Sequence, residues 1–222
     1  MALIGAETHK NPRDFVDQPA GFALILHALE KALSEKGHAS LVVCGGTSPL
    51  SIFTALSQSD LDWQHITVTL ADDRMVAENH KDSNIRLVLD TLLQDRAAGA
   101  SFHPLQSLVA EKLMPFDVVL LGMGTDGHIA SLFPDMLGEL KAFDISARPE
   151  ILTTSEKGVP AYPRITMNLS MLIHSQALFL LIKGEEKAEL LEKACHHGLQ
   201  NICYPVTALL CQDQAPVTVI NL

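Results

Sequence analysis

Three glycines and a histidine follow a strongly apolar segment in the stretch FDVVLLGMGTDGHIASLFPD, residues 116–135. Gly122, Gly124 and Gly127 match the pattern G-x-G-x-x-G, which cradles the pyrophosphate of a dinucleotide when a helix opens after the third glycine. That use also requires an acidic residue about 20 positions further on, at the end of a strand. Asp144 lies near this distance, but its surroundings make a poor buried strand, and a proline would stop the helix within two turns.

The competing interpretation makes His128 the reactive group of this loop. An imidazole exchanges its proton near neutral pH, so it can take a proton from water and return it. Asp126 lies two residues earlier and could orient the ring. The weak match to a dinucleotide site favours this general base, and a histidine that caps its own short helix is the simplest alternative.

A second glycine turn occurs in VVCGGTSPLSIF. Gly45 and Gly46 end an apolar strand, and Thr47 and Ser48 follow them. The next residue is a proline that suits the first position of a helix, with Ser48 as the N-cap. Backbone N–H groups, two hydroxyls and a helix N-terminus would then surround one point, which suits a phosphate. It is not a Walker loop, because no lysine stands in the G-K-[ST] position; an ordinary strand-to-helix turn is the alternative.

Charged residues follow the next predicted strand, in LADDRMVAENHKDSN. Asp72, Asp73 and Arg74 would emerge at the carboxyl end of a parallel strand, where open α/β sheets bind their ligands. Arg74 could contact an anion, and Asp72 or Asp73 could orient it or act as a base. The alternative is a solvated run of charges.

Two further cations stand in YPRITMNLS and LIKGEEKAELL, namely Arg164 and Lys187. Lys187 falls in the first turn of a predicted helix, where a cation opposes the helix dipole. This unfavourable placement indicates an anion nearby, although a surface lysine on an acidic helix would look the same. A serine hydrolase of the G-x-S-x-G type is unsupported, because the motif does not occur.

Predicted strands and helices alternate along the chain, and several strands are continuous apolar runs, which is typical of a parallel sheet covered on both faces. We therefore expect an α/β, doubly wound, mainly parallel sheet with helices on both faces, in a single domain of residues 1–222. The predicted helices span 20–36, 49–57, 83–93 and 185–197, with Ser83 as an N-cap and Gly37 as a stop signal. The predicted strands span 39–46, 65–73, 177–184 and 216–220, with another from residue 116 and an edge strand at 150–154.

The composition excludes several classes of protein. The formal net charge of −10 argues against a nucleic-acid partner and means that an anionic ligand needs a local cluster of positive groups. No apolar run is long enough to span a membrane, and the N-terminal residues do not resemble a secretory signal. We expect a cytoplasmic protein with free thiols, either a monomer or a homodimer.

One cluster could supply four zinc ligands, namely Cys195, His196, His197 and Cys203. Adjacent ligands at the end of a helix point about 100° apart, and the paired spacing of a zinc knuckle is missing. We therefore expect no bound metal.

Five segments together resemble the 6-phosphogluconolactonase family, in that family's order and approximate spacing: GGTSPLSIF, DDRMVAENHKDSN, GMGTDGHIASLFP, PRITMN and KGEEKA. This family is similar to glucosamine-6-phosphate deaminase. Arg74 stands where the deaminases have a tyrosine, and Phe133 and Pro134 follow the Ala-Ser-Leu of the lactonases; both features favour the lactonase. Asp73 is a departure, since the lactonases usually carry glutamate there.

The resemblance implies hydrolysis of 6-phospho-D-glucono-1,5-lactone, with no cofactor, and His128 as the general base beside Asp126. It implies that Arg74 reaches the sugar end or the phosphate. The implied phosphate site consists of Gly45, Gly46, Thr47, Ser48, Arg164 and Lys187, with Asp72, Asp73, Gly124 and Gly127 as further candidates. A dinucleotide-binding protein and a non-catalytic regulator that binds sugar phosphates are the alternatives.

Overall fold

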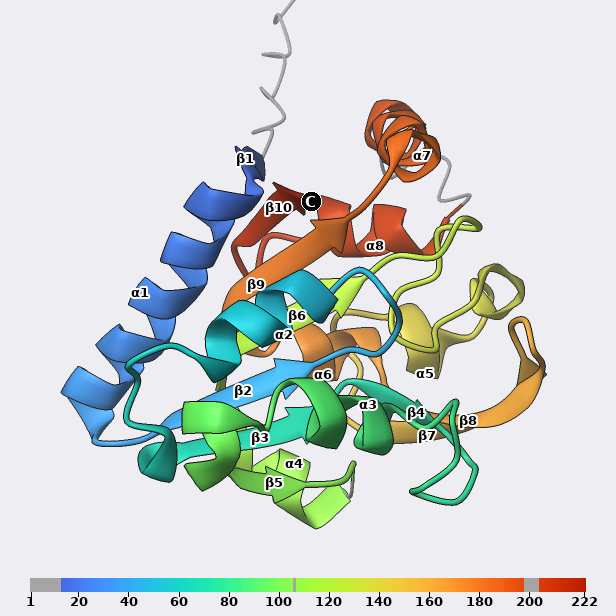
Figure 1. The fold of residues 1–222 in the computed structure, drawn as a ribbon. Coiled ribbons are helices and arrows are strands. Elements are labelled where there is room, and N and C mark those ends of the chain that lie inside the picture. Colours follow the sequence, from blue (N-terminus) through green and yellow to red (C-terminus); the bar gives the residue numbers. More distant parts are fainter. Residues whose placement is uncertain (1–12, 106, 198–203) are drawn as a thin grey trace, which may run out of the picture.

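Seven parallel strands form the central sheet of the computed structural model, which describes residues 13–105, 107–197 and 204–222. Every neighbouring pair in this sheet runs parallel (Figure 1). The two central strands β6 and β2 are buried along almost their whole length, because both of their faces are covered. In spatial order the strands are β1 (Arg13–Asp17), β10 (Val217–Asn221), β9 (Ser175–Ile182), β6 (Phe116–Gly122), β2 (Ala39–Val43), β3 (Ile66–Leu70) and β5 (Ser101–His103).

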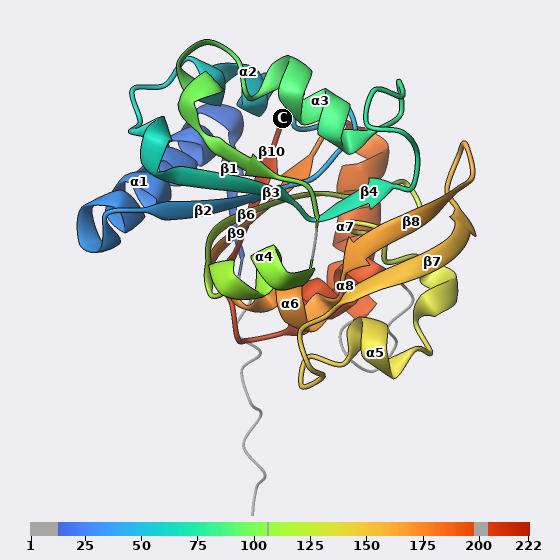
Figure 2. The ribbon, with the colours of Figure 1, turned by 90° about the horizontal axis from the view of Figure 1, so that it is seen from below.

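Helices cover both faces of this sheet, as the doubly wound fold class predicts (Figure 2). On one side lie α1 (Gln18–Lys36), α2 (Leu50–Ser57) and α3 (Asn84–Thr91), and on the other lie α4 (Ser107–Leu113), α6 (Leu169–Ile173) and α8 (Pro205–Cys211). The described residues also include the helices α5 (Leu140–Phe143) and α7 (Glu185–His197) and the 3₁₀ turns η1 (Trp63–His65), η2 (Asp95–Gly99) and η3 (Pro134–Met136). The fold-class prediction is confirmed, whereas the single-domain assignment stays a prediction.

Local signals set most helix ends. The side chain of Asp17 accepts a hydrogen bond from the Ala20 N–H, so α1 begins two residues before the predicted start. Gly37 ends α1 in the left-handed conformation, with φ of 73°, as predicted. Ser83 caps α3, as predicted, by accepting from the Arg86 N–H.

The start of α2 differs from the prediction. Pro49 occupies the cap position and its carbonyl accepts from the Phe53 N–H at 2.8 Å, so the helix begins at Leu50. Ser48 is therefore not the N-cap.

A second sheet of three antiparallel strands was not expected from the sequence. It contains β4 (Asp72–Arg74), β8 (Tyr162–Met167) and β7 (Ile151–Lys157), in that order. The prediction of one strand over residues 65–73 is wrong, because the chain leaves the parallel sheet after Leu70 and then pairs with β8. In this pairing Arg74 lies directly opposite Arg164.

The amino ends of β2 and β6 are joined by a buried carboxylate, at the ends opposite to the polar turns that follow these strands. Asp117 is 4% exposed, and its Oδ2 accepts from the Ser40 N–H at 2.9 Å and from the Ser40 hydroxyl at 3.1 Å. Lys36 contacts the other carboxylate oxygen. This contact fixes the two central strands relative to each other.

Replacing Asp117 with alanine should lower the free energy of unfolding by about 2–4 kcal/mol. The change would leave the buried donors of Ser40 and the Lys36 ammonium without their carboxylate acceptor. Urea denaturation measures the change. The matched control is Asp60→Ala, which removes an exposed carboxylate paired with Arg96 and should cost less than about 1 kcal/mol. Equal losses in the two variants would show that the Asp117 contacts do not join the strands.

Candidate active site

A cavity of about 310 Å³ opens at the carboxyl ends of the central strands. From the middle of the sheet, successive strands are added towards one edge in the order β2, β3, β5 and towards the other edge in the order β6, β9, β10. The strand order therefore reverses between β2 and β6. This reversal is where open α/β sheets form their binding crevices. The lining residues are Cys44, Gly45, Gly46, Thr47, Ser48, Asp72, Arg74, Asn84, Gly122, Met123, Gly124, His128, Ala130, Arg164 and Lys187.

The imidazole of His128 is held by Asp126. Its Nδ1 lies 2.5 Å from Oδ1 of Asp126, which also accepts from the His128 N–H at 3.2 Å. Burial favours the neutral form of Asp126, but the hydrogen bond and charge of His128 outweigh it and lower the pKa of this carboxyl. An ionised Asp126 keeps the proton on Nδ1, which leaves Nε2 as an acceptor for a proton from water.

Gly124 allows this pair to form. A Cβ at this position would lie 2.2 Å from both Cε1 and Nδ1 of His128 and 2.7 Å from Oδ1 of Asp126. The absence of a side chain at residue 124 is therefore a steric requirement of the pair. Gly127 serves the same loop in another way, since its φ of 80° is left-handed and its Cα packs towards Tyr204.

The dinucleotide interpretation of this loop is wrong. Residues 128–133 form no helix; instead Met123 and Leu132 each make an isolated bridge with Ile129. The proposed ribose-binding residue, Asp144, ends the short helix α5 rather than a strand. Without a helix after Gly127, a pyrophosphate has no helix N-terminus to bind. The alternative of a histidine capping its own helix fails for the same reason.

The turn after β2 brings its backbone to the same cavity. Gly46 adopts φ of 88°, a left-handed conformation that favours glycine. Thr47 and Ser48 follow it in the cavity lining, and Ser48 is 6% exposed. Gly45 fits closely against Asn84, as the clash of a hypothetical Cβ with the Asn84 amide oxygen at 1.8 Å shows.

Cationic side chains reach the cavity from three elements, β4, β8 and α7. Arg164 is 5% exposed, and its Nε and Nη2 donate to the Lys157 carbonyl at 3.2 and 2.9 Å. Burial, followed by the nearby Arg74 guanidinium, lowers the pKa of Arg164. Lys187 lies in the first turn of α7 and lines the same cavity. This local positive charge is what an anion needs in a chain of net charge −10.

One aromatic ring connects the imidazole with the arginine of β8. The ring centroids of Phe133 and His128 are 4.6 Å apart, and Cζ of Arg164 lies 5.8 Å from the Phe133 centroid. Phe133 is 5% exposed, so the spacing of the two polar groups is fixed by packing.

The two neighbouring aspartates lie in different places. Asp72 lines the cavity, and its Oδ2 accepts from the Ser131 hydroxyl. Asp73 instead faces the start of α3, where its Oδ1 accepts from the backbone N–H of Asn84 at 2.6 Å and of Arg74 at 2.7 Å. Burial raises the pKa of Asp73 despite these donors. Asp73, which is shorter than the glutamate expected from the resemblance, thus stabilises the start of α3 and is not among the cavity-lining residues.

Asn84 and Cys44 line the cavity although neither was among the sequence candidates. Asn84 begins α3 and is 1% exposed, and its only signal in the sequence is a polar residue directly after a helix cap. Cys44 is buried but also lines the cavity. Burial, with Asp72 nearby, raises the pKa of Cys44 to about 12, so the thiol is neutral and a poor nucleophile.

The zinc candidates lie partly outside the described residues, because Cys203 and the side chains of His196 and His197 are not described. Among the residues that are described, no group of three or more His, Cys, Asp or Glu side chains could hold a metal ion. In the same part of the chain, no helix is both long and apolar enough to cross a membrane.

The fold and the site together place the protein in one class, the doubly wound α/β enzymes that bind their ligands at the carboxyl edge of a parallel sheet. Within this class, the family model for glucosamine-6-phosphate isomerases and 6-phosphogluconolactonase matches residues 18–219. The chain belongs to this family, and the resemblance seen in its motifs is confirmed.

Named relatives of the chain agree with this assignment. A 6-phosphogluconolactonase of Neisseria meningitidis is 38% identical over 201 residues, which covers 84% of this chain and 86% of the relative. The crystal structure of a 6-phosphogluconolactonase from Shewanella baltica has a TM-score of 0.81 and 33% identity, and covers 94% of this chain and 96% of that one. A putative 6-phosphogluconolactonase from Neisseria gonorrhoeae also has a TM-score of 0.81, with 36% identity and coverage of 95% and 99%.

Replacing Gly124 with alanine should displace the His128 ring from Asp126, because the new methyl group would overlap both side chains. The ring resonances of His128 in an NMR spectrum should shift relative to the wild type. The control is Gly138→Ala, since a Cβ at Gly138 meets no atom within 4 Å and its φ is not left-handed. Unchanged His128 resonances in the Gly124 variant would contradict the steric requirement.

Proposed function

We propose that the chain hydrolyses 6-phospho-D-glucono-1,5-lactone to 6-phospho-D-gluconate, the lactone-opening step of the oxidative pentose phosphate pathway, with His128 as the general base. The names of the relatives support the substrate. The observation that carries the proposal is one cavity lined by an oriented imidazole, an anion-suited glycine turn and three cations.

The reaction begins when Nε2 of His128 takes a proton from a water molecule that attacks C1 of the lactone. A tetrahedral oxyanion forms on C1. The imidazolium then returns its proton to the ring oxygen as the bond between C1 and that oxygen breaks. This step leaves a carboxylic acid at C1, a hydroxyl at C5 and a neutral imidazole. The acid then loses its proton to water and becomes the carboxylate.

Asp126 does no proton transfer in this scheme. It holds the Nδ1 proton and stabilises the imidazolium while that ion exists. Backbone N–H groups of the two glycine turns are the donors available to the oxyanion, and Arg74 is left to contact the anionic part of the substrate. Each such donor is typically worth ~3–4 kcal/mol in the transition state.

The phosphate provides position rather than chemistry. The turn at residues 45–48, together with Arg164 and Lys187, would bind it and so hold C1 against the attacking water. The scheme uses only protein groups and water. The expected cytoplasmic location and the monomeric or homodimeric state stay predictions.

Replacing His128 with asparagine should lower kcat by about 10²–10⁴-fold and leave KM nearly unchanged, because the general base acts on water rather than on substrate binding. Fresh lactone is the substrate, and the spontaneous hydrolysis rate is subtracted. His65→Asn serves as the control, since His65 is exposed and pairs with Asp62 on the surface. Near-normal turnover by the His128 variant would remove this residue from the mechanism.

Replacing Lys187 or Arg164 with alanine should raise KM roughly tenfold or more and change kcat less, because each loses a charged contact to the phosphate. Steady-state kinetics measure both constants. The control is Lys193→Ala, an exposed lysine of the same helix that pairs with Glu189. An unchanged KM in both site variants would mean that the phosphate binds elsewhere.

The wild-type protein itself separates the proposed function from its alternatives. Tight binding of 6-phosphogluconate without hydrolysis of any lactone would favour a sugar-phosphate-binding regulator. A thermal shift with NAD(P), and none with a phosphosugar, would contradict both the proposed function and the geometry of the loop after β6.

A further inference from the structure

We propose that Asn84 is a positioning residue that aims the Arg74 guanidinium at the anionic part of the substrate without cancelling its charge. The same side chain holds the phosphate turn against β4 through Gly45. The inference rests on the proposed function, because it assumes that the cavity binds an anionic sugar phosphate. Asn84 is 1% exposed and lines the cavity.

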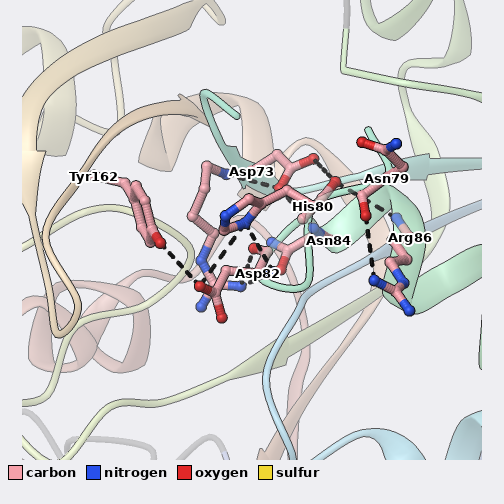
Figure 3. Close-up of polar contacts among 9 residues, drawn as sticks. Asp73, Asn79, His80, Asp82, Asn84, Arg86 and Tyr162 are labelled. Atoms are coloured by element: carbon pink, nitrogen blue, oxygen red, sulfur yellow. Dashed lines mark hydrogen bonds and ion pairs between the residues drawn. The ribbon is translucent and has the colours of Figure 1, made fainter. Parts of the chain in front are cut away.

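Two neutral oxygens hold Arg74. Its Nη1 donates to Oδ1 of Asn84 at 2.7 Å and to the carbonyl of Asp82 at 3.0 Å. The loop that carries Asp82 is itself tied to the second sheet, since the Tyr162 hydroxyl donates to Oδ2 of Asp82 at 2.9 Å (Figure 3). The Asp82 N–H donates to Nδ1 of His80 at 3.2 Å. The two hydrogen bonds from Nη1 thereby fix one edge of the Arg74 guanidinium. Because this group is planar and rigid, its other N–H donors are then held in fixed directions as well.

The orientation of the Asn84 side chain is determined by its own partners. Its backbone N–H donates to Oδ1 of Asp73 (Figure 3), and its Nδ2 donates to the Asp72 carbonyl at 2.8 Å. Because Nδ2 faces a carbonyl, Oδ1 is the atom that faces Arg74. The Asn84 amide therefore has one orientation, with Nδ2 towards the backbone of β4 and Oδ1 towards the Arg74 guanidinium.

The same amide explains why residue 45 is glycine. A Cβ at Gly45 would lie 1.8 Å from Oδ1, 2.3 Å from Cγ and 2.6 Å from Nδ2 of Asn84. Gly45 is not in a left-handed conformation, so the requirement comes from the neighbouring side chain and not from the backbone. Asn84 thus connects the phosphate turn with Arg74.

An amide suits this place better than a carboxylate. Arg74 and Arg164 lie opposite each other, and their combined charge is what an anion would bind. An acid at residue 84 would pair with Arg74 and add a fourth carboxylate to those of Asp72, Asp73 and Asp82. The neutral oxygen accepts the hydrogen bond while the guanidinium keeps its full charge for the substrate.

Asn84→Asp tests the charge argument, because the shape is kept while a negative charge is added. The dissociation constant of 6-phosphogluconate, measured by calorimetry, and KM for the lactone should both rise roughly tenfold or more. We expect kcat to change less than about threefold, which a general loss of structure would not produce.

The matched control is Asn168→Asp. Asn168 is also fully buried, caps the start of α6 and donates from Nδ2 to two backbone carbonyls, but it is not among the cavity-lining residues. Its variant should lose stability and keep the affinity for 6-phosphogluconate. Equal losses of affinity in both variants would overturn the proposal.

A double-mutant cycle tests whether Asn84 acts through Arg74. Asn84→Ala alone should weaken 6-phosphogluconate binding several-fold, and in an Arg74→Ala background it should add less than about twofold. The same loss in both backgrounds would overturn the positioning role. If the wild type binds no 6-phosphogluconate, the proposed function fails instead.

A second cycle needs no substrate. Gly45→Ala should lower Tm, and in an Asn84→Ala background the same change should lower Tm much less, because the overlapping amide is gone. Purely additive losses would overturn the contact between the turn and Asn84, whatever the substrate of the cavity. This readout keeps a failure of the inference distinct from a failure of the proposed function.

Discussion

Two arginines held directly opposite each other across β4 and β8 are the constraint around which the site is arranged. Like charges in such a pair repel, and burial adds to the cost for Arg164. Neutral oxygens stabilise them, namely the carbonyls of Asp82 and Lys157 and the amide of Asn84. A carboxylate partner would relieve the repulsion more strongly, but it would also remove the positive charge that a phosphate requires. The structure therefore keeps the pair charged at a cost in stability.

The two sheets contribute different parts of this site, and neither is sufficient alone. The parallel sheet supplies backbone turns after β2 and β6, with the imidazole of His128 in the second turn. The small sheet lies at the carboxyl ends of those strands and supplies Arg74 and Arg164 (Figure 2). Phe133 packs between the imidazole and Arg164, so the distance between these two groups is set by a rigid ring. Under the proposed function, this spacing would favour substrates of matching length.

The sequence predicted those features that depend on neighbouring residues. The apolar runs of β6 and β9 and the glycine patterns around His128 are local, so the parallel strands and the candidate loops were found. The second sheet was missed because β4 is three charged residues long, and its pairing depends on a partner far along the chain. Asn84 was missed for the same reason, since its contacts with Gly45 and Arg74 appear only after folding. Asp73 was assigned to the site because a carboxylate that faces a helix start looks the same in sequence as one that faces a cavity.

Strain and stabilisation lie at opposite ends of the same strands. At the carboxyl ends, Gly46 and Ala130 adopt left-handed conformations beside the cavity, and for Ala130, with φ of 47°, this costs about 1–2 kcal/mol. At the amino ends, Asp117 joins β2 to β6 through three hydrogen bonds with Ser40, and Lys36 contacts its other carboxylate oxygen. Because the strands are rigid and continuous between the two ends, well-paired contacts at one end can hold unfavourable geometry at the other. Because the contacts that stabilise the sheet lie far from the cavity, the turns around His128 can keep conformations that are unfavourable for stability.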